Sequence, residues 1–192
     1  MKKTIILFIY VMINIFAFAQ QPFAPVGTEW YYGVERLVPH AYDYVLLKSI
    51  DETIVDGKLC SIISNVKGGM ICYDDMKGSV YAYQSNDTVY FYDNHAKFVP
   101  VHIWSAQQGD SWETLFGVTV HVEAVETISI LGRTLKLQHV SYEAAEIGNN
   151  DRPSYPSIVI ENIGDINYLY AFNVNLRGSC DEFTVRYSGL RV

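Results

Sequence analysis

Short runs of β-branched and aromatic residues, separated by turn-forming residues, recur along this chain from Thr28 onward. They return about every 8 to 12 residues, and no stretch of about ten residues shows the apolar periodicity of an amphipathic helix. The pattern predicts an all-β fold, an antiparallel meander that forms a barrel-like or sandwich domain with at most one or two helical turns, at 142–147. The predicted strands are 29–36, 42–50, 53–55, 58–64, 70–73, 79–83, 88–92, 98–104, 118–130, 134–142, 157–161, 168–172 and 183–187.

Turn residues and one proline refine this pattern. Residues 55–58, 76–78 and 84–87 combine Gly, Asp, Asn and Ser between predicted strands, which is typical of hairpin turns. Pro100 has no N–H to give to a sheet ladder, so the strand around it is expected at a sheet edge or beside a bulge.

The N-terminus has the parts of a secretory signal peptide. Lys2 and Lys3 form a short basic start, an apolar run covers 5–18, and small residues precede a cleavage point at Ala19. The run is shorter than the roughly 20 residues that a membrane span needs. We therefore predict that residues 1–19 are a signal peptide and that 20–192 form a single β-rich domain. The mature chain is then exported to the periplasm or the outside of the cell, with no integral membrane segment.

Charge and composition restrict the partners of the mature chain. Loss of two lysines with the signal peptide takes the net charge from −7 to −9 and leaves 14 of the 15 tyrosines. An acidic chain has no positive field for nucleic acid, so no nucleic-acid partner is expected. A hydrophobic content of 49% excludes disorder, because such a chain can bury a core.

Four tyrosines are predicted on one face of a β-hairpin. A four-residue turn after Tyr83 would put Tyr83 opposite Thr88 and Tyr81 opposite Tyr90, with Tyr92 on the same face. Tyrosine offers a flat apolar ring and a hydroxyl, so this face could bind a glycan or a protein. The alternative is that cross-strand aromatic pairs only stabilise the sheet.

Three cysteines, Cys60, Cys72 and Cys180, allow at most one internal disulfide. A hairpin centred on Val66 places Cys60 and Cys72 opposite each other, about 4.5 to 5.5 Å apart at Cα, which suits a bridge. If 65–69 all form the loop, the pair is diagonal at roughly 7 to 8 Å and too far apart. A Cys60–Cys72 disulfide and two small buried side chains are the alternatives.

His121 and Glu123 lie on one face of a predicted strand, and His139 lies on the next strand. Two histidines and a carboxylate could hold zinc. A hairpin centred on Gly132 places His139 opposite Val125, however, roughly 13 Å along the strand from His121. We therefore expect no metal site here.

Sequence motifs of known catalytic devices are missing. No G-x-S-x-G, H-E-x-x-H, phosphate-binding or dinucleotide-binding motif occurs, so no catalytic residue and no cofactor is assigned. Neighbouring carboxylates at 51–52, at 74–75, and at Asp110 and Glu113 would allow a secreted hydrolase of glycans or peptides, since a glycosidase needs only two of them. The alternative reading of each pair is a turn-forming role.

Four segments in order resemble a family of secreted, functionally uncharacterised β-rich proteins of Bacteroidetes, similar to the N-terminal module of type IX secretion cargo proteins. These segments are GTEWYY at 27–32, DETIVDGKLC at 51–60, GDSW at 109–112 and IENIG at 160–164. The resemblance covers most of the mature chain. It implies export but no activity and no site residue, and no sorting domain is expected here.

The sequence therefore favours a secreted, non-catalytic binding or envelope-associated module of unknown ligand that uses the tyrosine face. The hydrolase is one alternative. A further alternative is a carrier of a small apolar ligand, because Gly27 and Trp30 near the start resemble the G-x-W entry of lipocalins with one extra residue between them. That likeness is one of architecture, which does not establish function.

Overall fold

Twelve strands and one short helix make up the described part of the protein, a computed structural model in which residues 23–36, 41–67, 79–93, 96–143, 154–167 and 183–191 are described. The strands are β1 (Glu29–Arg36), β2 (Ala41–Val55), β3 (Lys58–Lys67), β4 (Val80–Ser85), β5 (Thr88–Tyr92), β6 (Phe98–Ile103), β7 (Ser111–Glu113), β8 (Thr119–Ile130), β9 (Arg133–Glu143), β10 (Ser154–Ile160), β11 (Gly164–Asp165) and β12 (Phe183–Arg191). The helix is a single 3-10 turn, η2 (Leu115–Gly117). None of the described helical structure has the length and apolarity to cross a bilayer.

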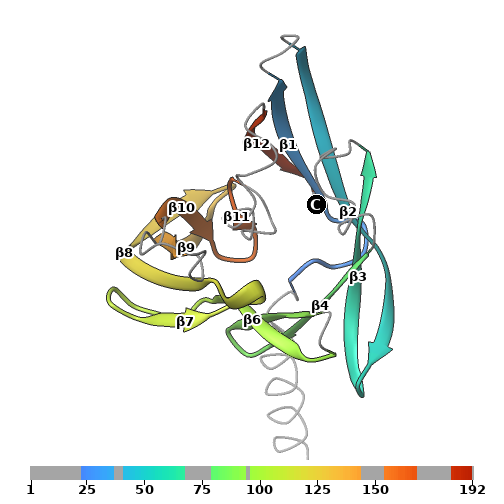
Figure 1. Ribbon diagram of the computed structural model, residues 1–192, viewed down its shortest axis with the longest axis horizontal. Helices are drawn as coiled ribbons and strands as arrows, with labels where there is room; N and C mark the ends of the chain where they lie inside the picture. Colours follow the sequence, from blue (N-terminus) through green and yellow to red (C-terminus); the bar gives the residue numbers. More distant parts are fainter. Residues whose placement is uncertain are drawn as a thin grey trace, which may run out of the picture.

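The strands form two antiparallel sheets. One has seven strands in the order β12-β1-β2-β3-β4-β5-β6, and the other has five in the order β11-β10-β9-β8-β7. Both sheets curl and face each other, as Figure 1 shows with β8 to β10 on the left and β2 and β3 on the right. The predicted all-β, barrel-like fold is confirmed.

Side chains from both sheets fill the space between them. Trp30, Tyr32 and Phe91 come from the seven-stranded sheet, while Val120 and Val140 come from the five-stranded sheet, and all belong to one buried cluster. Burial of this apolar surface from both sides joins the sheets into one core.

Alternation along the strands explains which side chains enter that core. In β5, Val89 and Phe91 are buried, and Thr88, Tyr90 and Tyr92 are partly exposed. Successive side chains of a strand point to opposite faces, so the apolar set lies inward and the tyrosines lie outward.

One predicted strand boundary is wrong, because β2 continues through a β-bulge. β2 is one strand of 15 residues, whereas the sequence predicted separate strands at 42–50 and 53–55. The register of β2 against β3 shifts between Ser49 and Asp51, which leaves Ile50 unpaired. An extra residue reverses the faces without ending the strand, so 41–55 stay one strand.

The hairpin turns agree with the prediction in one case and differ in another. Val55 pairs with Lys58 across a two-residue turn, as predicted. In the β8–β9 hairpin the turn is also two residues, since Ile130 pairs with Arg133, so the prediction of a turn centred on Gly132 is wrong. Leu131 takes a positive φ of 50° there, which two-residue hairpin turns require.

Pro100 lies in β6, the last strand of the seven-stranded sheet, as its missing N–H predicted. It pairs with Tyr90 next to a register shift, so the strand is both an edge strand and bulged. The predicted strands at 70–73 and 168–172 lie outside the described residues.

Candidate functional site

β4 and β5 form the hairpin that carries the four predicted tyrosines. Ser85 pairs with Thr88, so the loop is two residues long and begins at Asn86, whose φ is 53°. Tyr83 therefore lies opposite Tyr90, and the predicted four-residue turn with Tyr83 opposite Thr88 is wrong. Because the error is two residues in register, it changes the partners but not the faces.

The rings on the outward side of this hairpin contact one another. Tyr83 stacks on Tyr90 with ring centroids 6.0 Å apart, and Tyr81 meets Tyr92 edge to face at 6.5 Å. Phe98 of β6 adds a fifth ring, 5.6 Å from Tyr83 and 5.0 Å from Tyr92. These distances are those of interacting aromatic pairs. We call this set of five residues the aromatic face.

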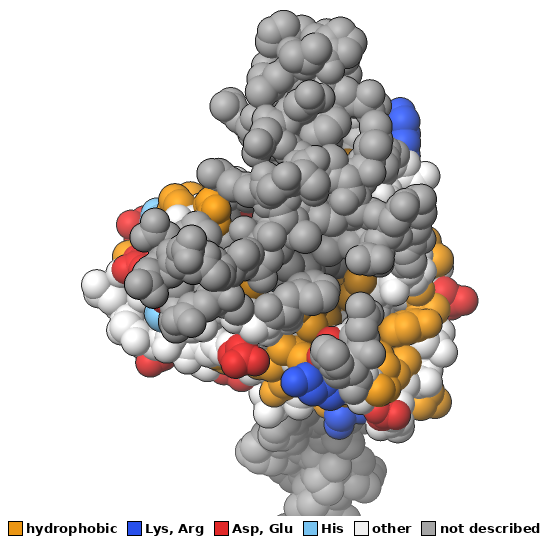
Figure 2. Space-filling model, in the orientation of Figure 1, with side chains coloured by type: hydrophobic (Ala, Val, Ile, Leu, Met, Phe, Trp, Pro, Cys, Tyr) orange, Lys and Arg blue, Asp and Glu red, His pale blue; other side chains and the backbone are white. Residues whose placement is uncertain are grey.

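All five rings of the aromatic face are partly exposed, whereas Ala82, Val89 and Phe91 on the other side of the same strands are buried. Within the described part of the chain, the hydroxyls of Tyr81 and Tyr83 make no hydrogen bond. Figure 2 shows hydrophobic side chains gathered at the lower right, where Figure 1 places β3 and the β2–β3 hairpin. Acidic and basic side chains lie along their edge in that view.

Two charged side chains from the β2–β3 turn reach the aromatic face. The Tyr92 hydroxyl donates to Asp56 Oδ2 at 3.1 Å, and Lys58 Nζ lies 4.8 Å from the centroid of the Tyr83 ring. Partial loss of solvent, then the hydrogen bond to Asp56 and the charges of Asp56 and Asp93, raise the pKa of the Tyr92 phenol above its usual 10. The rings therefore have both a carboxylate acceptor and an ammonium donor at their edge.

Phe98, Asp56 and Lys58 were not predicted as part of this site. They lie outside the β4–β5 hairpin, on β6 and in the β2–β3 hairpin. The available signal was the alternation of Phe98 with Val99, which predicts an outward ring on the strand next to β5. The neighbouring turn could not be placed from sequence because the register of β3 on β4 was unknown.

A second polar cluster lies inside the protein, around Asp165 of β11. Its carboxylate accepts hydrogen bonds from the Tyr142 hydroxyl at 2.7 Å, the Ser157 hydroxyl at 2.8 Å and the Asn167 N–H at 2.7 Å. Asp165, Tyr142 and Ser157 are all buried. Burial, followed by the charge of Asp165 and its hydrogen bond, raises the pKa of Tyr142 well above 10.

This cluster also joins the two sheets. The Tyr32 hydroxyl donates to the backbone oxygen of Asp165 at 3.2 Å, and Trp30 Nε1 donates to the backbone oxygen of Ile163 at 2.9 Å. Both aromatic residues belong to β1 of the opposite sheet. Because solvent does not reach the carboxylate, we interpret the cluster as a structural connection between the sheets.

Each predicted candidate for a metal site has a protein partner of its own. His121 Nε2 lies 3.0 Å from Glu143 Oε2, and His139 Nε2 lies 3.5 Å from Glu126 Oε1. Glu123 accepts a hydrogen bond from a serine hydroxyl on β9. Among the described residues, no three His, Cys, Asp or Glu side chains come together to hold a metal ion.

The register behind the zinc argument also needs correction. His139 pairs with Ala124, not with Val125, because the hairpin turn has two residues, and a bulge at Glu123 shifts the register once more before His121. The partner of His121 across the strands is Ser141.

The predicted carboxylate pairs have local roles where the structure describes them. Asp51 accepts the N–H of Glu52 through Oδ1, and both side chains are exposed. Asp110 accepts the N–H of Gln107 in a turn, and Glu113 is exposed on β7. The pair at 74–75 lies outside the described residues.

Cys60 is a buried free thiol on the outward side of β3, and it donates to the backbone oxygen of Lys58 at 3.4 Å. Burial raises the pKa of this thiol. β2 and β4 pair with the two edges of β3 at Ser61 and Ile63, so this part of β3 has no free edge for the predicted hairpin with 70–73. Cys72 lies outside the described residues, so a Cys60–Cys72 disulfide stays a prediction without that geometric support.

The chain was compared with protein families, curated proteins and solved structures. No family model, curated protein or solved structure matches it. The resemblance to secreted Bacteroidetes proteins therefore stays a prediction, and function has to be argued from the geometry of the site.

Proposed function

We propose that this protein is an exported, non-catalytic binding module that recognises a glycan on its aromatic face. The observation that carries the proposal is the group of five partly exposed rings on one side of β4, β5 and β6. A tyrosine presents a flat apolar surface and a hydroxyl while losing little side-chain entropy. The C–H faces and hydroxyl groups of a sugar ring match these two properties.

The charged groups beside the rings favour an uncharged glycan. Asp56 and Lys58 lie at the edge of the aromatic face, and Asp93 lies next to Tyr92 in the chain. Carboxylates accept hydrogen bonds from hydroxyls, and an ammonium group donates to them. Because both signs of charge are present, neither an acidic nor a basic ligand is selected.

A binding screen on residues 20–192 tests this proposal. The probes are α-1,4-glucan, β-1,4-glucan, β-1,4-xylan and β-1,4-mannan, presented in affinity electrophoresis and then by calorimetry. We expect at least one to bind, and Tyr81→Ala and Tyr90→Ala to weaken that binding. Ile54→Ala is the matched control, because it removes an exposed apolar side chain, 73% accessible, outside the aromatic face.

Two results would reject the proposal. The first is that none of the four polysaccharides binds. The second is that a polysaccharide binds equally well to the wild type, to Tyr81→Ala and to Tyr90→Ala, which would place the contact elsewhere.

A further inference from the structure

A second tyrosine pair lies on the outward side of the seven-stranded sheet, on β1 and β2. The ring centroids of Tyr31 and Tyr44 are 5.9 Å apart. Trp30 and Tyr32, which alternate with Tyr31 along β1, are fully buried in the core. Tyr31 therefore points away from the core, and Tyr44 shares its face because it pairs with Gly33, two residues further along β1.

This pair has a lysine over one ring, as the aromatic face does. Lys67 Nζ lies 3.9 Å from the centroid of Tyr44, and Lys58 Nζ lies 4.8 Å from that of Tyr83. An ammonium group at such a distance is attracted to the ring face and remains a hydrogen-bond donor.

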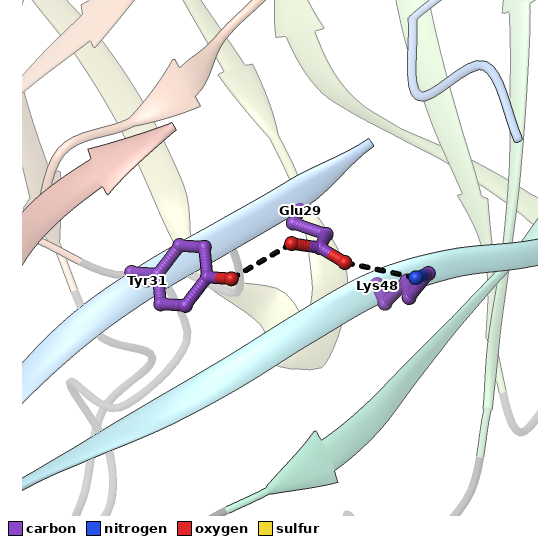
Figure 3. A network of polar contacts seen from close by, with 3 residues as sticks. All are labelled: Glu29, Tyr31 and Lys48. Carbon is purple, nitrogen blue, oxygen red and sulfur yellow. Dashed lines mark hydrogen bonds and ion pairs between the residues drawn. The ribbon is translucent and has the colours of Figure 1, made fainter. Parts of the chain in front are cut away.

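In this pair, too, a carboxylate accepts a hydrogen bond from a tyrosine hydroxyl. Tyr31 donates to Glu29 Oε2 at 2.7 Å, and Lys48 Nζ donates to Glu29 Oε1 at 2.8 Å (Figure 3). The corresponding contact on the aromatic face joins Tyr92 and Asp56 at 3.1 Å. Because Glu29 is held at both oxygens, the Tyr31 ring is oriented before any ligand binds, which lowers the entropic cost of binding.

Strand register gives the separation of the two tyrosine sets. Tyr81 pairs with Ile62 of β3, and Ile62 pairs with Asp51 of β2. Tyr44 precedes Asp51 by seven positions along β2, and one of these, Ile50, is in the bulge. The offset is about 20 Å along the strands and about 10 Å across two strands.

We propose that Tyr31 and Tyr44 form a second subsite of the same surface, and that the ligand is a linear, neutral polysaccharide rather than a short sugar. This inference rests on the proposed glycan-binding function. Three features repeat at both places, namely a ring pair about 6 Å apart, a lysine over one ring and a carboxylate on a tyrosine hydroxyl. A chain that contacts both subsites gains affinity, because the second contact is made within one complex.

A chain-length series tests the second subsite. Calorimetry on residues 20–192 compares the two-unit sugars of the four polysaccharides with the polymers themselves. We expect the polymer that binds to do so at least about tenfold more tightly than its two-unit sugar. In the double variant Tyr31→Ala and Tyr44→Ala, affinity for the polymer should fall to that of the two-unit sugar. The double phenylalanine variant keeps both rings and should keep the gain, as should the control Ile54→Ala.

The outcomes separate this inference from the proposed function. Equal affinity for short and long chains, or a gain that survives in the double alanine variant, overturns the second subsite and leaves glycan binding intact. If no probe binds at all, glycan binding fails and the second subsite fails with it. If the double alanine variant does not fold, Tyr44→Leu replaces it, because leucine keeps apolar bulk without a flat ring, and the same loss of the gain is expected.

Discussion

Tyrosines on the two sides of the seven-stranded sheet have different environments. Tyr32 points inward and is fully buried, and its neighbour in space Tyr142 is also buried; their hydroxyls donate to the backbone oxygen and to the carboxylate of Asp165, respectively. Tyr83 and Tyr90 point outward, are partly exposed, and contact each other through their rings. The same residue type therefore connects the two sheets on one side and offers a surface on the other.

The hydrogen-bond acceptor that each hydroxyl requires explains this difference. A buried hydroxyl costs free energy unless it is hydrogen-bonded, so the inward tyrosines require an internal acceptor, which Asp165 supplies. An outward hydroxyl can bond to water and needs no such acceptor. Changes on the inward side should therefore lower stability, and changes on the outward side should alter binding with little effect on stability.

The largest effect is expected from Asp165→Ala, which removes the carboxylate that accepts from Tyr142 and Ser157 and leaves the backbone oxygen that accepts from Tyr32. Tyr142 and Ser157 would be left as buried donors without their partner. We expect the free energy of unfolding to fall by about 3 to 5 kcal/mol, measured by urea denaturation. Glu113→Ala on the exposed side of β7 is the control, with a change within about 0.5 kcal/mol. A loss below about 1 kcal/mol for Asp165→Ala would contradict the structural role of the cluster.

Sequence patterns identified the outward tyrosines but not their inward counterpart. Alternation alone assigns Tyr81, Tyr83, Tyr90 and Tyr92 to one face, and an error of two residues in register leaves that assignment intact. Asp165 follows Ile163 and Gly164 in a short segment with no neighbouring carboxylate, so no local pattern marks it. Its partners are 8 and 23 residues away in sequence, and only the packing of the sheets brings them together.

Bulges and turn length account for several of the other errors. An extra residue at Ile50 lies between what were predicted as two strands, and the two-residue turn at 131–132 moves His139 from Val125 to Ala124. A bulge depends on how two strands pair, which a single strand's sequence does not determine. The turn of two residues at Asp56 was predictable, because Asp-Gly favours the positive φ values found there, 47° and 73°.

A buried histidine of the core, His102, should make the stability of the fold depend on pH in the acid range. His102 stacks on Trp104 with ring centroids 5.1 Å apart, and within the described part of the chain its Nε2 has no hydrogen-bond partner. Burial lowers the pKa of His102 to about 3 from 6.5. As the pH falls below 6.5, the unfolded chain binds a proton that the folded chain does not, so stability is lost down to pH 3.

We expect His102→Phe, which keeps a stacking ring, to remove this loss. Between pH 6 and pH 4 the wild type should lose up to about 1.4 kcal/mol per pH unit more than the variant. Urea denaturation of both proteins at several pH values measures the difference. Parallel pH profiles would mean that His102 binds its proton at the same pH in the folded and the unfolded chain, which would contradict its lowered pKa.

Tyr142→Phe sharpens the comparison by removing one hydroxyl and keeping the ring. Asp165 Oδ2 loses a donor, and we expect a loss of about 1 to 3 kcal/mol at neutral pH. The raised pKa of Tyr142 adds a second effect. Above pH 10 the unfolded chain releases the Tyr142 proton while the folded chain keeps it, so the wild type loses stability as the pH rises. Denaturation between pH 9 and pH 11 should show a shallower loss in the variant, and equal slopes would contradict the buried hydrogen bond.

Tyr83→Ala should have the smallest effect on stability, because it acts on the outward side. Its ring stacks on Tyr90, contacts Phe98 at a tilt and lies under the Lys58 ammonium group, and a cross-strand aromatic pair contributes about 0.5 to 1 kcal/mol to stability. Loss of the ring should nevertheless weaken binding of the proposed polysaccharide ligand about five- to tenfold, since a stacking contact contributes about 1 kcal/mol. Urea denaturation and calorimetry on the same preparation measure both quantities. A fall in stability as large as that of Asp165→Ala, with binding unchanged, would show that the outward tyrosines stabilise the sheet just as the inward ones do.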